Sequence, residues 1–213
     1  TAVGNTLYFQ ANDGIHGREL WKSDGTASGT VMVKDVWIGS TGGFATGGDI
    51  HHPTTITSIG NTVFLSMNDG TQGYELWKSD GTASGTVIVK DIRSGASGST
   101  PQHLTPVGNT LYFAADDIGG NSWNLWKSDG TTSGTIKIIN TSGLHELTAV
   151  GNTLYFVNND GTHGSELWKS DGTSSGTVMV KDINVGSNGS SPAYLTAVGD
   201  TLFFTADDGI NGN

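Results

Sequence analysis

Four near-identical copies of one octapeptide constrain the fold of this chain more than any other feature of its sequence. The letters Glu-Leu-Trp-Lys-Ser-Asp-Gly-Thr occur unchanged at 19–26, 75–82 and 166–173, and the copy at 124–131 differs only in Asn124. Each copy joins a short apolar strand to a turn in which Asp caps the backbone and Gly accepts a positive φ. Such repetition is typical of architectures that stack one supersecondary unit several times.

The octapeptide lies inside a longer unit that opens on a Val-Gly-Asn-Thr-like turn. The glycines of this turn are Gly4, Gly60, Gly108, Gly151 and Gly199, with successive spacings of 56, 48, 43 and 48 residues. We therefore predict one repeat domain over 1–213, with units of about 48 residues that belong to a longer protein. The predicted units are 1–54, 55–102, 103–145 and 146–193, followed by a partial fifth at 194–213.

Each unit contains four strand-like segments and none with a helical apolar period. In the fourth unit these segments are 147–150, 153–157, 166–169 and 177–183, rich in β-branched and aromatic residues. A β-solenoid usually repeats faster, and a sandwich does not repeat its sequence. The pattern predicts an all-β chain, a β-propeller of four-stranded antiparallel blades, with four complete blades and a partial fifth.

Composition limits the partners of this chain. Hydrophobic residues make up 34%, but 33 Gly and only 14% charged residues favour many turns between strands over disorder. The net charge of −10 argues against nucleic acid and anionic membranes, and is compatible with cations, neutral glycans or basic proteins. The chain has no Cys, and no apolar run approaches the ~20 residues that a membrane-spanning helix needs.

The octapeptide, followed by a Gly-Thr-Val-x-Val-Lys-Asp-Ile strand, resembles the ELWxxDGT repeat family of large bacterial extracellular proteins. The resemblance covers essentially the whole chain. The exceptions are Asn124, the stretch 117–120 in place of Asp-Gly-x-x-Gly, and the long first linker. The resemblance implies a propeller-like repeat array in a secreted or cell-surface protein, and it brings no catalytic residues with it.

Propeller connectivity places the variable linkers and the Asp-Gly-x-x-Gly turns on one face, opposite the nearly invariant turns. The linkers are 37–55, 93–103, 141–146 and 184–194, and all six His lie on the same face. Variation on one face of a regular scaffold is typical of a binding surface. The residues that we predict to contact a ligand there are Trp37, His51, His52, His103, Trp123 and His163.

The recurring tryptophans receive a structural interpretation. A ring of sugar-stacking aromatics is the alternative, but burying one indole between neighbouring blades removes ~150–250 Å² from water. We therefore expect these residues to pack between blades: Trp21, Trp77, Trp126 and Trp168. We expect the recurring Glu19, Glu75 and Glu166 to pair with a nearby lysine or to bond to a backbone group, rather than to hydrolyse glycosides.

The acidic second-to-third turns are calcium candidates, since hard cations prefer clustered oxygen ligands. Turn formation alone is the alternative, because these turns lack the full ladder of a calcium loop. The candidate ligands are Asp13, Asp69, Asp116, Asp117, Asp160, Asp207 and Asp208.

The sequence thus favours a non-enzymatic extracellular module for binding or adhesion, whose ligand is a glycan or a cell-surface or matrix protein. A secreted carbohydrate-active enzyme with catalytic groups on the linkers is one alternative, and a structural array in a sheath or filament is another. The second strand of the partial unit, around 202–205, is expected to present an unpaired edge. We expect that the protein continues past Asn213 or that another chain covers this edge.

Overall fold

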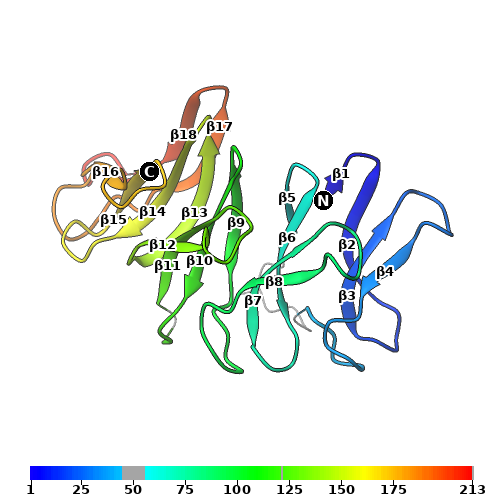
Figure 1. The fold of residues 1–213 in the computed structure, drawn as a ribbon. Helices are drawn as coiled ribbons and strands as arrows, with labels where there is room; N and C mark the ends of the chain where they lie inside the picture. The colour runs from blue at the N-terminus through cyan, green and yellow to red at the C-terminus, as the bar shows by residue number, and fades with distance from the viewer. Residues whose placement is uncertain (45–55, 121, 213) are drawn as a thin grey trace.

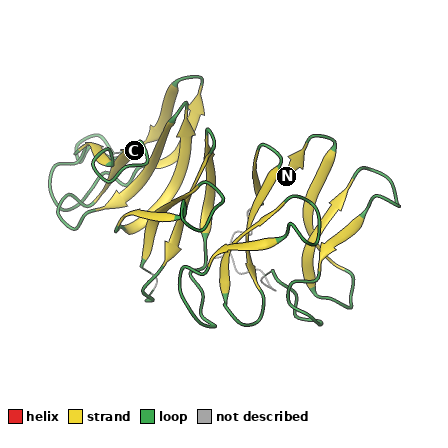
Figure 2. Cartoon of the chain, in the orientation of Figure 1, coloured by secondary structure: helices red, strands yellow, loops and turns green. Residues whose placement is uncertain are grey.

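The structure is a computed structural model that describes residues 1–44, 56–120 and 122–212. These residues form 18 β-strands and no helix (Figure 2), which confirms the all-β prediction. The described part of the chain accordingly contains no helix that is long and apolar enough to cross a membrane.

The strands form four four-stranded antiparallel sheets and one two-stranded sheet, each a meander in chain order. The first sheet contains β1 (Ala2–Val3), β2 (Thr6–Asn12), β3 (Arg18–Ser23) and β4 (Val31–Lys34). The second contains β5 (Thr57–Ile59), β6 (Thr62–Asn68), β7 (Tyr74–Ser79) and β8 (Val87–Lys90). The third contains β9 (Gln102–Val107), β10 (Thr110–Asp116), β11 (Trp123–Ser128) and β12 (Ile136–Ile139). The fourth contains β13 (Ser142–Val150), β14 (Thr153–Asn159), β15 (Ser165–Ser170) and β16 (Val178–Lys181). The last is the hairpin of β17 (Ala193–Val198) and β18 (Thr201–Thr205).

The Ser-Asp-Gly-Thr turn is built by its own side chains, as the second sheet illustrates. Asp80 Oδ1 accepts the backbone N–H of Thr82 at 2.9 Å and its hydroxyl at 2.7 Å. Gly81 has a φ of +85°, which residues with a Cβ rarely adopt. The hydroxyls of Ser79 and Thr86 lie 2.7 Å apart and tie the two ends of the turn together. The interpretation of this recurring Asp as a turn former is confirmed.

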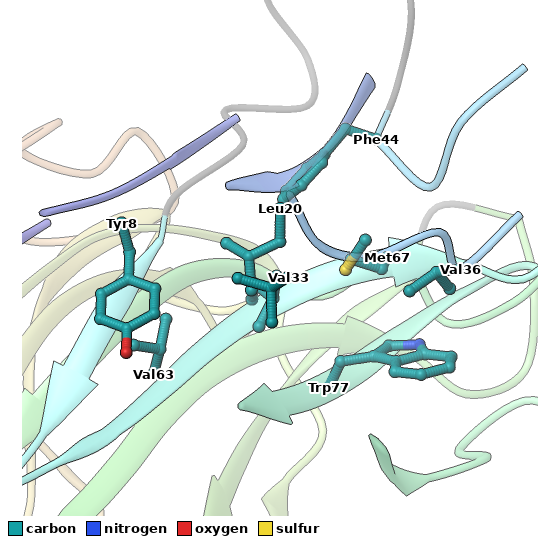
Figure 3. Packing of buried hydrophobic residues seen from close by; sticks show 9 residues of the cluster. Tyr8, Leu20, Val33, Val36, Phe44, Val63, Met67 and Trp77 are labelled. Carbon is teal, nitrogen blue, oxygen red and sulfur yellow. The ribbon is translucent and has the colours of Figure 1, made fainter. Parts of the chain in front are cut away.

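The sheets follow one another around an arc in chain order, with the first and last at opposite ends (Figure 1). We call the contact between the first and second sheets the first junction, and number the others likewise. Each junction has its own hydrophobic core, drawn from the facing sides of two consecutive sheets. At the first junction Tyr8, Leu20 and Val33 of one sheet face Val63 and Trp77 of the next (Figure 3).

The recurring tryptophans pack at these junctions. Trp77 and Trp126 are only 6% and 7% exposed, which confirms the structural interpretation for both. Trp168 belongs to the third junction but is half-buried, and Trp21, which faces no preceding sheet, is also half-buried. The difference between Trp168 and its two buried counterparts marks the third junction as irregular.

All four strands of the fourth sheet differ in their bounds from the sequence-based prediction: β14 and β15 are two residues longer, and β13 and β16 differ for reasons that the structure shows. β13 begins at Ser142 rather than 147, so most of the predicted linker 141–146 is strand. The physical reason is that Asn124 Oδ1 accepts Thr141 N–H and Asn158 Oδ1 accepts Ser142 N–H, both at 3.1 Å, which directs the chain into the sheet. β16 ends at Lys181 rather than 183, because the amide of Ile183 bonds to Glu166 instead of a neighbouring strand.

Candidate functional site

The recurring glutamate holds the linkers on the variable face. Glu75 is fully buried, and its carboxylate accepts the N–H groups of Ile92, Arg93 and Ser99 at 3.1, 3.0 and 2.9 Å. The Ser99 hydroxyl donates to the same carboxylate at 2.5 Å, and Ser99 O then accepts the N–H of Asp116 from the next sheet. We call this arrangement of glutamate, linker and next sheet the linker clasp.

The linker clasp recurs with small variations. Glu166 accepts Ser190 N–H at 2.8 Å and the Ser190 hydroxyl at 2.5 Å. Glu19 accepts the N–H of Gly43 at 2.7 Å, but Gly43 has no hydroxyl to donate. Burial raises the pKa of Glu75 to about 7, although the hydrogen bonds from Ser99 and the linker amides act in the opposite direction. The recurring glutamate therefore accepts hydrogen bonds from backbone N–H groups, as predicted.

The acidic turns are closed by their own carboxylates. Asp160 Oδ1 accepts the N–H groups of Thr162 and His163 at 2.8 and 2.9 Å, and its Oδ2 lies 2.7 Å from His163 Nδ1. These hydrogen bonds lower the pKa of Asp160 to about 2, and the Asp160 carboxylate raises the pKa of His163. Asp13, Asp69 and Asp208 accept backbone N–H groups two and three residues ahead in the same way.

The remaining acidic candidates have other partners. Asp207 Oδ1 accepts Gly209 N–H at 2.8 Å, and Asp116 Oδ1 accepts Gly119 N–H at 2.7 Å. Asp117 is held by the Asn124 amide at 2.5 Å and by Lys137 Nζ at 2.8 Å. Across 1–44, 56–120 and 122–212, no group of three or more His, Asp or Glu is arranged to hold a metal ion. Calcium binding by these turns stays a prediction.

The structure places the described candidates for ligand contact on different strands and loops. Trp37 is half-buried against the turn of the second sheet, where a Cβ on Gly70 would lie 2.7 Å from the indole nitrogen. Trp123 is half-buried against the core of the third junction. His103 is the second residue of β9, and burial and the charge of His145 lower its pKa. His163 lies in its acidic turn, while His51 and His52 fall outside the described residues.

The first two junctions share a lysine bridge between sheets. Lys34, at the end of β4, donates from Nζ to Thr86 O at 2.8 Å and lies 5.7 Å from the ring centroid of Trp77. Lys90, at the end of β8, donates to Thr135 O at 2.7 Å and lies 5.7 Å from the ring centroid of Trp126. The ammonium thus satisfies a carbonyl and interacts with the indole face at once.

The third junction lacks this bridge. The residue at the end of β12 that corresponds to Lys34 and Lys90 is Ile139, which has no ammonium. The lysine of β12, Lys137, bonds to Asp117 within its own sheet instead. Trp168 and Thr177, the counterparts of the bridged indole and carbonyl residue, both line an open cavity of about 450 Å³.

Most residues that line the cavity have polar side chains, but most of the surface that they expose to it is apolar. The lining consists of Ile139, Asn140, Thr141, Ser142, Asn158, Asn159, Asp160, Gly161, Trp168 and Thr177. Asn158, which is 2% exposed, stands where β6 has Met67 and β10 has Ala115, and its Oδ1 holds Ser142. Sequence reasoning missed this site, although Ile139 in place of a repeated lysine was a visible signal. The candidate functional site is this third-junction cavity.

Comparison with known proteins supports the fold and leaves the family open. The sequence matches no model of a known protein family and no curated protein. Among solved structures, puromycin hydrolase is similar, with a TM-score of 0.53 and 11% identity over 89% of this chain and 29% of that chain. Its S511A mutant complexed with PGG matches with a TM-score of 0.51 and 12% identity, at the same shares of the two chains.

The fold is that of a β-propeller. The chain spans less than a third of the length of puromycin hydrolase, and identity this low shows the fold alone. BamB from Moraxella catarrhalis also matches, with a TM-score of 0.49 and 15% identity over 98% of this chain and 54% of that chain. The four-stranded propeller blades predicted from the sequence are confirmed.

Proposed function

We propose that this chain is a non-enzymatic extracellular module for binding or adhesion, and that its ligand, a glycan or a surface protein, is held at the third-junction cavity. The observation that carries the proposal is the open cavity of about 450 Å³ at the third junction, where Ile139 stands in place of the bridging lysine. This volume lies within the range of about 300–1,000 Å³ typical of ligand sites.

The lining suits a ligand with both apolar and hydroxyl-bearing faces. Trp168 offers a flat indole, while Asn140, Ser142 and Asn159 contribute amide and hydroxyl groups. A sugar ring presents a C–H face to an aromatic side chain and hydroxyls to amides, so this combination favours a saccharide. A surface protein could present the same chemistry through its own glycans.

The recurring carboxylates give less support to the alternative of a carbohydrate-active enzyme. Glycoside hydrolysis needs two carboxyl groups about 5–10 Å apart on either side of the scissile bond. Glu75 and Glu166 are instead fully buried in separate sheets, each within its own linker clasp. The extracellular location rests on the resemblance to the ELWxxDGT repeat family, and calcium assistance rests on the acidic turns.

Binding to arrays of glycans and of surface and matrix proteins, with calcium and with a chelator, tests the proposal. Asn140 is exposed at the cavity, and Asn140→Tyr should fill it and weaken binding at least about tenfold. Asn152→Tyr is the matched control, because Asn152 is exposed in the turn between β13 and β14 and does not line the cavity. Equal loss in both variants, or no binding to either array, would contradict the proposal.

A further inference from the structure

The third-junction cavity lies where the first and second junctions hold a lysine side chain. In the first two junctions one ammonium meets two partners of the next sheet, a threonine carbonyl and an indole face. The residues that supply these partners in the fourth sheet are Thr177 and Trp168, and both line the cavity. The molecule therefore contains two internal templates for what this cavity can bind.

We propose that the third-junction cavity binds a primary ammonium group, placed over Trp168 and beside the Thr177 carbonyl as Lys34 and Lys90 are placed in their own junctions. The proposal rests on the binding role proposed above and names the chemistry of the ligand. The ligand class is a primary amine on a flexible or cyclic carbon frame, such as a lysyl side chain or an amino sugar.

The replacement of lysine by isoleucine removes the internal competitor for this position. Ile139 stands at the end of β12, where its apolar side chain cannot donate a hydrogen bond. Lys137 does not substitute for the missing lysine, because its Nζ lies 2.8 Å from Asp117 in the same sheet. Trp168 is correspondingly more exposed than Trp77 and Trp126. An incoming ammonium therefore meets an accessible indole over which no lysine of the described residues lies.

Charge around the cavity also favours a cation. Asp160 lies at the rim and carries an ionised carboxylate, and the chain as a whole has a net charge of −10. His163 is paired with Asp160, so its protonation would add a competing positive charge at low pH. Measurement at pH 8.5 keeps an alkylammonium protonated, since amines of this kind titrate at about 10.4.

Calorimetric titration with n-butylammonium and with neutral n-butanol tests the charge requirement. Cation–π attraction and the carbonyl contact together predict that the ammonium binds at least about tenfold tighter than the alcohol. The indole N–H resonance of Trp168, assigned with Trp168→Phe, should shift on binding. Equal affinity for both probes would overturn the proposal, because the cavity would then recognise only apolar carbon.

Substitution at Ile139 tests the position. Ile139→Lys should rebuild the lysine bridge to Thr177, weaken n-butylammonium binding at least about tenfold and raise the melting temperature. Ile139→Leu is the matched control and should keep wild-type affinity. Unchanged affinity in Ile139→Lys would place the bound amine elsewhere and overturn the proposal.

Two further probes distinguish the source of the amine. Tighter binding of Nα-acetyl-lysine methylamide than of glucosamine would identify a lysyl side chain, and the reverse order would identify an amino sugar. Both orders uphold the ammonium site. Binding of glycans that is lost in Asn140→Tyr, with no binding of any amine to the wild type, would overturn this inference and leave the proposed function standing.

Discussion

At the scale of single residues, the buried glutamates decide how the variable linkers run. Glu75 and Glu166 use both carboxylate oxygens to collect N–H and hydroxyl donors from the linkers that follow their sheets. Asn124 holds the equivalent place in the third sheet with a single amide oxygen, which accepts only Thr141 N–H among the described linker donors. The linker that Asn124 holds is also the shortest of the four predicted linkers.

The titration of Glu75 makes stability depend on pH. Burial raises its pKa from 4.5 to about 7, so between these values the folded protein keeps a proton that the unfolded chain releases. Its contribution is fully present below pH 4.5 and is lost as the pH rises through 7. The Glu75→Gln variant cannot titrate at this position and serves as the reference. The difference between the unfolding free energies of the wild type and of this variant should therefore decrease by about 3 kcal/mol as the pH rises across this window. Denaturant unfolding at pH 4.5 and 7.5 measures it, and a pH-independent difference would contradict the shift.

The recurring tryptophans should contribute differently to the unfolding free energy, because they are buried to different extents against a neighbouring sheet. Trp77→Ala should lower the unfolding free energy by about 3–5 kcal/mol, because it leaves a cavity in the core of the first junction. Trp21→Ala should cost clearly less, since Trp21 faces no preceding sheet and is half-buried. Chemical denaturation of both variants provides the comparison, and equal losses would argue against packing between sheets as the cause.

At the scale of elements, the linker residue that contacts the buried glutamate and a residue on the second strand of the next sheet vary together. At the second junction Ser99 donates its hydroxyl to Glu75, next to Ala115 of β10. At the first junction Gly43 replaces this serine and Met67 of β6 replaces the alanine. A Cβ on Gly43 would lie 2.6 Å from the terminal carbon of Met67, so the long methionine and the missing hydroxyl go together.

This pairing predicts a coupling between two positions. Gly43→Ser alone should destabilise through the clash with Met67, and Met67→Ala alone should cost about 2–5 kcal/mol through its cavity. The loss of unfolding free energy in the double variant should be smaller than the sum of the two single losses by about 1–3 kcal/mol, because the serine hydroxyl can then reach Glu19. A double-mutant cycle from equilibrium unfolding measures this coupling, and additive losses would rule it out.

At the scale of the whole molecule, the two-stranded sheet leaves one strand edge open. Among the described strands β18 pairs only with β17, as expected from the partial fifth unit. Its neighbourhood exposes large apolar side chains, with Tyr194 78%, Val198 60% and Phe203 57% exposed. An exposed apolar edge of this kind is a template for pairing with another chain.

The open edge predicts concentration-dependent self-association of this 213-residue chain. Phe203→Lys should reduce association, because a charge on an edge strand disfavours pairing with a second strand. Ile210→Lys is the control, since Ile210 is 87% exposed but lies outside the strands. Sedimentation velocity over a range of concentrations decides the matter, and a wild type that stays monomeric would contradict the prediction.

The sequence by itself determined the features that depend on local chemistry. Octapeptide repetition, turn residues such as Asp80 and Gly81, and runs of β-branched and aromatic residues predict four-stranded blades and their turns, because these interactions join residues close in the chain. The position of the candidate site, the third-junction cavity, depended on the tertiary structure. Lys34 meets Thr86 across 52 residues, and the corresponding contact is lost at Ile139. Only the packing of one sheet on the next shows that this loss leaves a cavity beside Trp168, because such contacts depend on how two sheets face each other in space.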